Sequence, residues 1–201
     1  MIAIVDTGGS NLASIQNALT RMGYNSVVTV DPKVLDDAAR LILPGVGHAG
    51  HAMEKLSASG LKTYLRETTK PVLGICLGMQ ILFEQSQEGP AECLGILPGE
   101  VTRLEPSEDF RVPHMGWSRL NTTANYSVLL AGIDPDAYFY FVHSYRTPMG
   151  VWTAAVAQAS ETVPAIVEFK NFYATQFHPE RSGEAGAKLI QNFLSLKELQ
   201  P

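Results

Sequence analysis

The sequence predicts an α/β fold, with a mostly parallel central sheet, helices on both faces and antiparallel strands added to it. In the first half of the chain, short apolar runs alternate with amphipathic stretches, the order that builds parallel strands joined by helices. After about residue 95, short apolar segments follow one another with turn residues between them, which is typical of antiparallel strands. No linker, repeat or low-complexity tract interrupts the 201 residues, so we expect a single domain over residues 1–201.

The elements of the first half each have a local cause. Residues 2–5 are all apolar, as expected of a strand buried on both faces. Leu12, Ile15, Leu19 and Met22 follow at spacings of three and four, which predicts an amphipathic helix closed by Gly23. The remaining elements are expected as strands at 27–30, 41–43 and 72–75, a helix at 61–67, and a helix that follows residue 76 and includes 81–84.

The second half predicts short strands and one helix. The strands are expected at 100–104, 117–120, 138–142, 152–158, 165–169 and 172–177. Lys170 and Asn171 separate the last two as a tight hairpin turn. From residue 184 the apolar residues Leu189, Phe193 and Leu196 lie on one helical stripe, which predicts a final helix.

Composition limits the classes of partner and compartment. The chain has 15 basic and 20 acidic residues and a formal net charge of −5, which argues against a nucleic-acid partner. Two cysteines make no disulfide framework, so we expect a reducing cytoplasmic location. The N-terminal apolar run has no basic start and ends at Asp6, so no signal peptide is expected, and no run is long enough to predict a membrane span. No Cys/His spacing indicates a metal site, and no cofactor is expected.

Cys76 lies at the centre of the most informative segment, Gly74-Ile75-Cys76-Leu77-Gly78. An apolar strand reaches Gly-x-Cys-x-Gly and a helix follows, the layout of a nucleophile elbow. The two glycines suit the tight turn, where a Cβ would collide with neighbouring backbone. At a helix N-terminus the helix dipole favours the thiolate, which is the nucleophilic form. The alternative is a buried structural cysteine between two packing glycines.

His178 and Glu180 are the candidate base and its orienting acid. His178 directly follows an apolar strand, so it lies at a strand end, where α/β sheets place their sites. Pro179 favours extended geometry for His178, and in an extended stretch residues two apart point the same way, so Glu180 can reach the ring. The alternative is a strand-end histidine beside a solvated carboxylate.

A third segment, Pro44-Gly45-Val46-Gly47-His48, ends another strand at the same edge. Acyl transfer needs backbone N–H groups that stabilise a developing oxyanion. Residues around Gly47 and the N–H of Leu77 are the candidate donors. A phosphate loop is a weak alternative, since no Lys-Ser/Thr follows, and a simple turn remains open. Residues 113–117 form an aromatic-rich loop, and 138–145 is a strand rich in aromatic residues. Such strands more often belong to a core, and His143 alone is more often a core histidine than a catalyst.

Together these motifs resemble the class I glutamine amidotransferases, the family with a Cys-His-Glu triad. The elbow with its following Gln80, the Pro-Gly-x-Gly segment and Phe-His-Pro-Glu near the C-terminus carry the resemblance, with elbow and His-Pro-Glu about 100 residues apart. The resemblance implies a flavodoxin-like fold, glutamine hydrolysis through Cys76, His178 and Glu180, and neither a metal nor a cofactor.

Within that family the chain is most similar to the glutaminase subunits of imidazole glycerol phosphate synthase. The segments 6–8, 44–48, 113–117 and 140–145 carry this similarity, which spans essentially the whole chain. It implies a heterodimer with a cyclase subunit, a (β/α)8 barrel that receives the ammonia. It also implies a glutamine pocket and oxyanion site, made by Val46, Gly47, Leu77, Gln80, Glu88, Ser144 and Tyr145. Two alternatives stay open: the glutaminase subunit of an anthranilate or aminodeoxychorismate synthase, and a non-catalytic binding subunit of the same fold.

Overall fold

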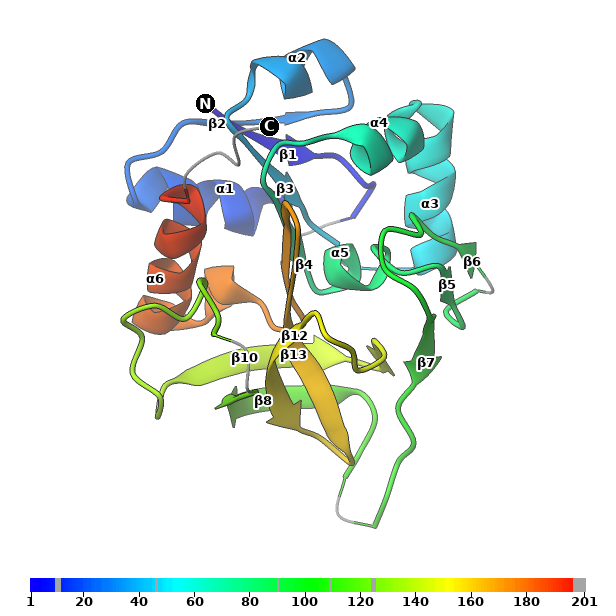
Figure 1. The fold of residues 1–201 in the computed structure, drawn as a ribbon, viewed down its shortest axis with the longest axis vertical. Coiled ribbons are helices and arrows are strands. Elements are labelled where there is room, and N and C mark those ends of the chain that lie inside the picture. The colour runs from blue at the N-terminus through cyan, green and yellow to red at the C-terminus, as the bar shows by residue number, and fades with distance from the viewer. Residues whose placement is uncertain (10–11, 46, 90, 109, 124–125, 197–201) are drawn as a thin grey trace.

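A central sheet of eight strands organises the molecule (Figure 1). The structure is a computed structural model, and it describes residues 1–201 apart from 10–11, 46, 90, 109, 124–125 and 197–201. In order across the sheet the strands are β2 (Ser26–Thr29), β1 (Ile2–Val5), β3 (Arg40–Leu43), β4 (Val72–Ile75), β14 (Phe172–Thr175), β13 (Thr162–Phe169), β12 (Thr153–Gln158) and β9 (Asn121–Thr122).

Five of these strands run parallel. β1 pairs with β2 and β3, β3 with β4, and β4 with β14, all in parallel register. β13, β12 and β9 then continue the sheet by antiparallel pairing. The predicted fold class is therefore confirmed, and the parallel part has the 2-1-3-4-5 order of flavodoxin-like sheets.

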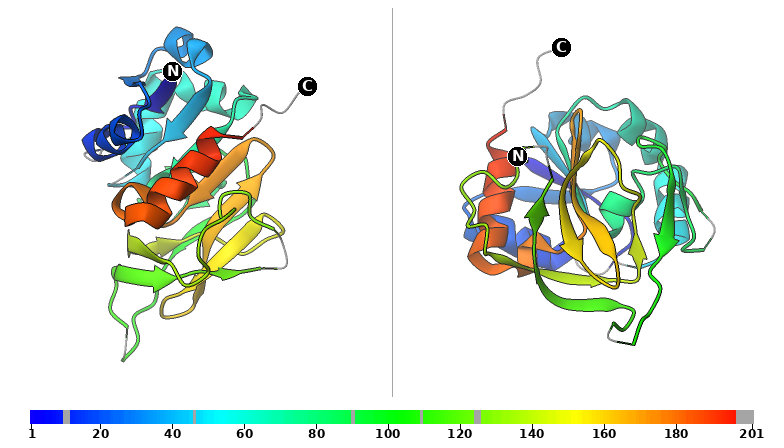
Figure 2. Two further views of the ribbon diagram at one scale, coloured as in Figure 1. Left: turned by 90° about the vertical axis from the view of Figure 1, so that its left-hand side faces the viewer. Right: turned by 60° about the horizontal axis from the view of Figure 1, so that its bottom comes forward.

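Helices cover both faces of the parallel part. The helical segments are α1 (Leu12–Arg21), α2 (Pro32–Asp37), α3 (Ala49–Ala58), α4 (Leu61–Glu67), α5 (Leu77–Gln80), the 3-10 turn η1 (Pro179–Arg181) and α6 (Gly183–Leu194). Figures 1 and 2 show α1 and α6 together on one side of the sheet, and Figure 1 shows α3 and α4 on the other. Among the described helices none is long and apolar enough to cross a lipid bilayer.

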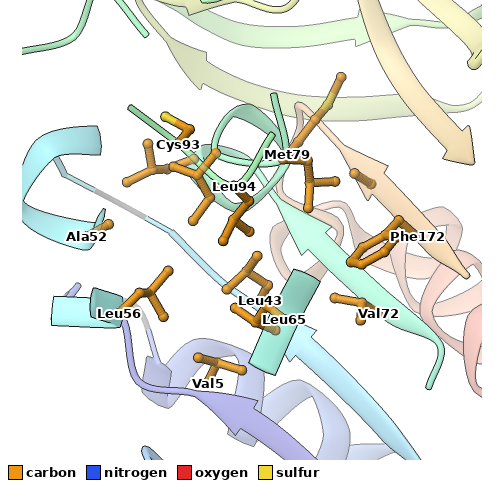
Figure 3. Close-up of a cluster of buried hydrophobic side chains, with 14 of the residues drawn as sticks. Val5, Leu43, Ala52, Leu56, Leu65, Val72, Met79, Cys93, Leu94 and Phe172 are labelled. Atoms are coloured by element: carbon orange, nitrogen blue, oxygen red, sulfur yellow. The ribbon is translucent and has the colours of Figure 1, made fainter. Parts of the chain in front are cut away.

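Alternation along the strands divides the core into two clusters. In β1, Ala3 and Val5 face the cluster that includes residues of α3 and α4, whereas Ile2 and Ile4 face the one that includes residues of α1 and α6. Figure 3 shows part of the first cluster, where Val5 and Leu43 from the sheet lie near Leu56 and Leu65 from the helices. The strands are apolar on both faces because both faces are covered.

Smaller sheets lie beside the central one. β10 (Tyr138–His143) pairs antiparallel with β8 (His114–Arg119). β11 (Tyr145–Arg146), β7 (Glu100–Arg103), β5 (Gln85–Ser86) and β6 (Ala91–Glu92) form a four-stranded sheet in that order. The chain between β4 and β14 thus makes these additional strands before it returns to the central sheet.

Most expected elements are present, but α2 and the two-residue strands β5, β6, β9 and β11 were not predicted, and three further differences are larger. The expected helix after residue 76 ends at Gln80, so the prediction of helix through 81–84 was wrong; Leu94 and Ile96 instead donate backbone hydrogen bonds to the carbonyls of Ile81 and Leu82. The segment 113–117, expected as a loop, begins β8 at His114 because it pairs with β10. α3 was not predicted, although its buried residues are spaced as on a helix, because half of them are alanines, which give a weak apolar stripe.

Candidate active site

Three neighbouring strand ends create the site. β3, β4 and β14 are adjacent and parallel, so their carboxyl ends reach the same edge of the sheet. Pro44 and Gly45 follow β3, Cys76 follows β4, and His178 comes three residues after β14. Strand order therefore brings together segments that are about 100 residues apart in the chain.

Cys76 is at a sharp strand-to-helix turn. Its backbone has φ 55° and ψ −108°, a conformation that non-glycine residues rarely adopt. Its N–H donates to the Thr175 carbonyl at 2.7 Å, while its own carbonyl accepts from the Met79 and Gln80 N–H groups at 3.0 and 3.2 Å. The turn is thus fixed by β14 on one side and by the first turn of α5 on the other. Such a strained, well-anchored residue is typical of a nucleophile elbow.

His178 and Glu180 form a buried pair beside this turn. His178 Nδ1 and Glu180 Oε1 are 2.9 Å apart, and both side chains are almost fully shielded from solvent. The expected contact exists, but the expected reason for it was wrong, since Pro179–Arg181 is a 3-10 turn rather than an extended stretch. The backbone N–H of His178 donates to the Tyr140 carbonyl of β10 at 2.9 Å, which fixes the position of the pair.

The environment of His178 favours its protonated form. Burial opposes the charge, but hydrogen bonding and charge from Cys76 and Glu180 outweigh it and raise the pKa of His178 to about 10. Since Nδ1 faces Glu180, Nε2 is the ring nitrogen available to the thiol. Nε2 is buried without a hydrogen bond of good geometry to any described residue, so the contact with Cys76 is loose. Catalytic hydrogen bonds are often long before substrate binds.

A cavity of about 330 Å³ opens over Cys76. This volume is within the range of small-molecule sites. Its lining comprises Gly47, Cys76, Leu77, Gln80, Glu88, Pro113, Val142, His143, Ser144, Tyr145 and His178. The structure therefore brings the expected pocket residues to one cavity with the cysteine and histidine, except Val46, which lies outside the described residues.

Glu88 joins the cavity to α3. Its Oε2 accepts the backbone N–H of Ala49 at 3.1 Å, at the first residue of α3, where a helix dipole favours a carboxylate. Burial nevertheless raises the pKa of Glu88 above its ordinary value. A half-buried acceptor group thus stands at the edge of the cavity.

One of the expected oxyanion donors, the N–H of Leu77, is already engaged in this arrangement. The Leu77 N–H donates to the Gly45 carbonyl at 3.3 Å. Gly47 is exposed with φ 111°, a conformation that glycine adopts readily. The role of Leu77 as an oxyanion donor therefore requires that the segment after β3 change its conformation.

Sequence reasoning missed several residues that line the cavity or approach the Cys76 sulfur. His143, read as a core residue, lines the cavity, and burial lowers its pKa to about 4. Pro113 and Val142 also line it. Gln176 is fully buried and donates to Cys76 Sγ at 3.7 Å. The available signal for Gln176 was a polar residue at the end of an otherwise apolar strand, two positions before the candidate base.

The second cysteine is unlike the first. Cys93 is buried, its Sγ donates to the Ala91 carbonyl at 3.6 Å, and burial raises the pKa of its thiol to about 11. These surroundings keep the sulfur in the unreactive thiol form.

Comparison with known proteins assigns the family. A family model described as "Glutamine amidotransferase class-I" matches residues 3–196. The chain belongs to the class-I glutamine amidotransferase family. This amidotransferase is 47% identical over 195 residues to imidazole glycerol phosphate synthase subunit HisH of Xanthomonas oryzae pv. oryzae (strain MAFF 311018), with 97% of each chain covered.

A second relative agrees with this assignment, and a solved structure shares the fold. The amidotransferase is 44% identical over 201 residues to subunit HisH of Vibrio cholerae serotype O1, covering 97% of this chain and 98% of the relative. A crystal structure described as that of a glutamine amidotransferase matches its fold with a TM-score of 0.73 at 20% identity, covering 96% of both chains. The resemblance to the glutaminase subunits of imidazole glycerol phosphate synthase, expected from sequence motifs, is confirmed.

Proposed function

We propose that this chain is the glutaminase subunit of an imidazole glycerol phosphate synthase, acting as one domain with Cys76, His178 and Glu180 as its catalytic triad. Its similarity to HisH subunits supports the pathway. The observation that carries the chemistry is the position of Cys76 and His178 on one cavity, with Glu180 2.9 Å behind the imidazole. A nucleophile, a base and a group that orients the base are the parts that acyl transfer requires.

The reaction follows from these three side chains. The thiol proton of Cys76 first passes to His178 Nε2, whose environment favours the protonated form, and the sulfur then attacks the side-chain amide carbon of glutamine. His178 then gives this proton to the amide nitrogen as the C–N bond breaks, releasing ammonia and leaving a glutamyl thioester. Water loses a proton to His178 and attacks the thioester, the C–S bond breaks, and glutamate and the free thiol result. Glu180 holds the Nδ1–H throughout and stabilises the imidazolium.

The cavity residues have roles in binding glutamine. Gln80 Nε2 donates to the Tyr145 carbonyl and to Gln176 Oε1, so both of its N–H groups are occupied and its oxygen is left as an acceptor for the substrate. Glu88, Ser144 and Gly47 provide further polar groups around the same cavity.

Ammonia released here would pass to a cyclase subunit, which we propose to be a (β/α)8 barrel in a heterodimer with this chain. There it reacts with a phosphoribulosyl-formimino aminoimidazole-carboxamide ribotide to give imidazole glycerol phosphate and aminoimidazole-carboxamide ribotide. A free thiol nucleophile needs a reducing environment, which supports a cytoplasmic location. The acidic net charge of −5 supports a partnership with protein rather than nucleic acid.

Glutaminase activity is expected to depend on the partner. The Leu77 N–H is engaged by the Gly45 carbonyl, so the oxyanion site, to which we also assign Val46 and Gly47, is incomplete. One missing oxyanion donor reduces kcat by about 10² to 10³. The purified chain should therefore turn over glutamine slowly, and much faster with the cyclase and its ribotide. Equal rates with and without them would contradict the proposed activation.

The decisive test compares two cysteine variants. Cys76→Ala should abolish glutamine-dependent product formation by the complex and leave ammonia-dependent formation intact. Cys93→Ala, which removes the other buried thiol, is the control and should retain both. Labelling of Cys76 by a glutamine-mimicking electrophile separates a catalytic subunit from a binding subunit. Loss of both activities in Cys76→Ala would mean damage to the fold or the interface, and the triad assignment would lose its support.

A further inference from the structure

A fully buried amide lies beneath the candidate nucleophile. Gln176 directly follows β14, the strand that pairs with β4, and its side chain has no exposed surface. Its Nε2 donates to Cys76 Sγ at 3.7 Å. The sulfur itself donates to the Val142 carbonyl at 3.8 Å. Cys76 thus has one acceptor for its proton in the thiol form and one N–H donor directed at the sulfur.

The orientation of this amide is fixed by groups that have only one possible role. A backbone carbonyl can only accept, so the Tyr145 carbonyl, 3.0 Å from Gln80, identifies the Gln80 nitrogen. The other N–H of that group donates to Gln176 Oε1 at 3.1 Å. The oxygen of Gln176 is therefore occupied, and its NH2 group faces the sulfur. His143 Nδ1, 2.8 Å from the same Tyr145 carbonyl, holds that carbonyl from a second side.

From this geometry we propose that Gln176 is a catalytic residue that donates a hydrogen bond to the Cys76 thiolate, with Gln80 as the positioning residue that orients it. The proposal rests on the proposed function, in which the thiol proton moves to His178. Once that proton has left, the sulfur can only accept, and a hydrogen bond to a charged acceptor is about twice as strong as one to a neutral group. The amide therefore stabilises the thiolate more than the thiol.

Four other ionisable groups lie near the sulfur, and a substitution at Gln176 removes none of them. His178 faces Cys76 from the segment after β14, with Glu180 of η1 behind it. His143 approaches from β10, and Glu88 lies across the cavity. A substitution at Gln176 leaves all four in place, so a change in thiol titration reports on the amide.

The test measures the rate of Cys76 alkylation by iodoacetamide against pH. It uses the full chain in a Cys93→Ala background, where Cys76 is the only thiol. Gln176→Leu, which keeps the volume and removes the donor, should shift the midpoint of this profile upward by about one pH unit. The limiting rate at high pH should not change. The matched control is Asn171→Leu, which removes another buried amide immediately before β14. The Asn171 amide donates to the carbonyls of Thr68 and Lys70, and its loss should leave the midpoint unchanged.

A double-substitution cycle tests the positioning role. Gln80→Leu frees the Gln176 amide to rotate and should also shift the midpoint upward. In the Gln176→Leu background the same change at Gln80 should have no further effect, since the group it orients is absent. Additive shifts would show that Gln80 acts on the sulfur independently and would overturn its positioning role.

An unchanged midpoint in folded Gln176→Leu overturns the proposal. If that variant does not fold, Gln176→Glu carries the test, because it keeps the shape and places a carboxylate where the N–H donor was. Its midpoint should rise by more than one pH unit, and an unchanged midpoint is again a refutation. Alkylation does not require glutamine turnover, so failure of this inference is distinguishable from failure of the proposed glutaminase function. That function is tested separately by the Cys76→Ala variant and by labelling with the glutamine-mimicking electrophile.

Discussion

Gly78 sets how closely the nucleophile turn can approach the end of β3. A Cβ built on Gly78 would lie 1.8 Å from the backbone oxygen of Leu43. Real Cβ atoms are not found closer than 3.0 Å, so Gly78→Ala requires a relative shift of about 1.2 Å between α5 and β3. The neighbour is backbone and cannot rotate away, so the strain passes to Cys76 on one side and to Pro44 on the other.

The expected cost is small for the fold and large for activity. Overpacking of this kind costs about 1–3 kcal/mol, which for a chain of this size lowers Tm by about 2–12 °C. A displacement of about 1 Å at a reacting group reduces turnover by about 100-fold. We expect both effects in Gly78→Ala, measured by thermal unfolding and by glutaminase assay of the complex.

A control separates close contact from backbone preference. Gly60 has φ 74° with open space around its Cβ position, so Gly60→Ala has only the conformational cost of about 1–2 kcal/mol and should keep its activity. The reasoning is refuted if Gly78→Ala is as active as the original chain, or if Gly60→Ala loses as much activity.

Two further predictions concern ionisable groups. Glu180→Gln removes a charge that raises the pKa of His178, so glutaminase kcat should fall by at least about 100-fold. The limb of the pH–rate profile that reports His178 should move to lower pH, and an unmoved limb would contradict the assigned pair. Glu184→Gln, at an exposed position, is the control. Burial lowers the pKa of His143 to about 4, so as pH falls this residue is protonated in the unfolded chain before it is protonated in the folded one. The free energy of unfolding should therefore fall by about 2 kcal/mol between pH 7.5 and pH 5 because of His143. Urea denaturation at both pH values should show that much less acid sensitivity in His143→Asn, and equal sensitivity would count against a buried neutral imidazole.

The extent to which sequence predicted this molecule differs between its parts. Residues 72–75 and 61–67 were predicted with the bounds of β4 and α4, and the hairpin at Lys170 and Asn171 is confirmed by the pairing of Phe169 with Phe172. These features depend on residues that are close in the chain. α3 and the short α5 were missed or misjudged, because packing rather than local propensity sets their presence and length.

The sequence alone determined the local chemistry: a cysteine in a strand-to-helix turn and a histidine two residues before an acid. Only the tertiary structure decided that they meet, because the parallel pairing of β14 with β4 joins segments separated by the intervening small sheets. The same holds for the orientation of Gln176 and for the neutral state of His143, which depend on contacts between side chains far apart in the chain. Hydrogen bonds and burial between residues that are far apart in the chain follow from the order of the strands in the sheet. Short-range residue patterns do not encode that order.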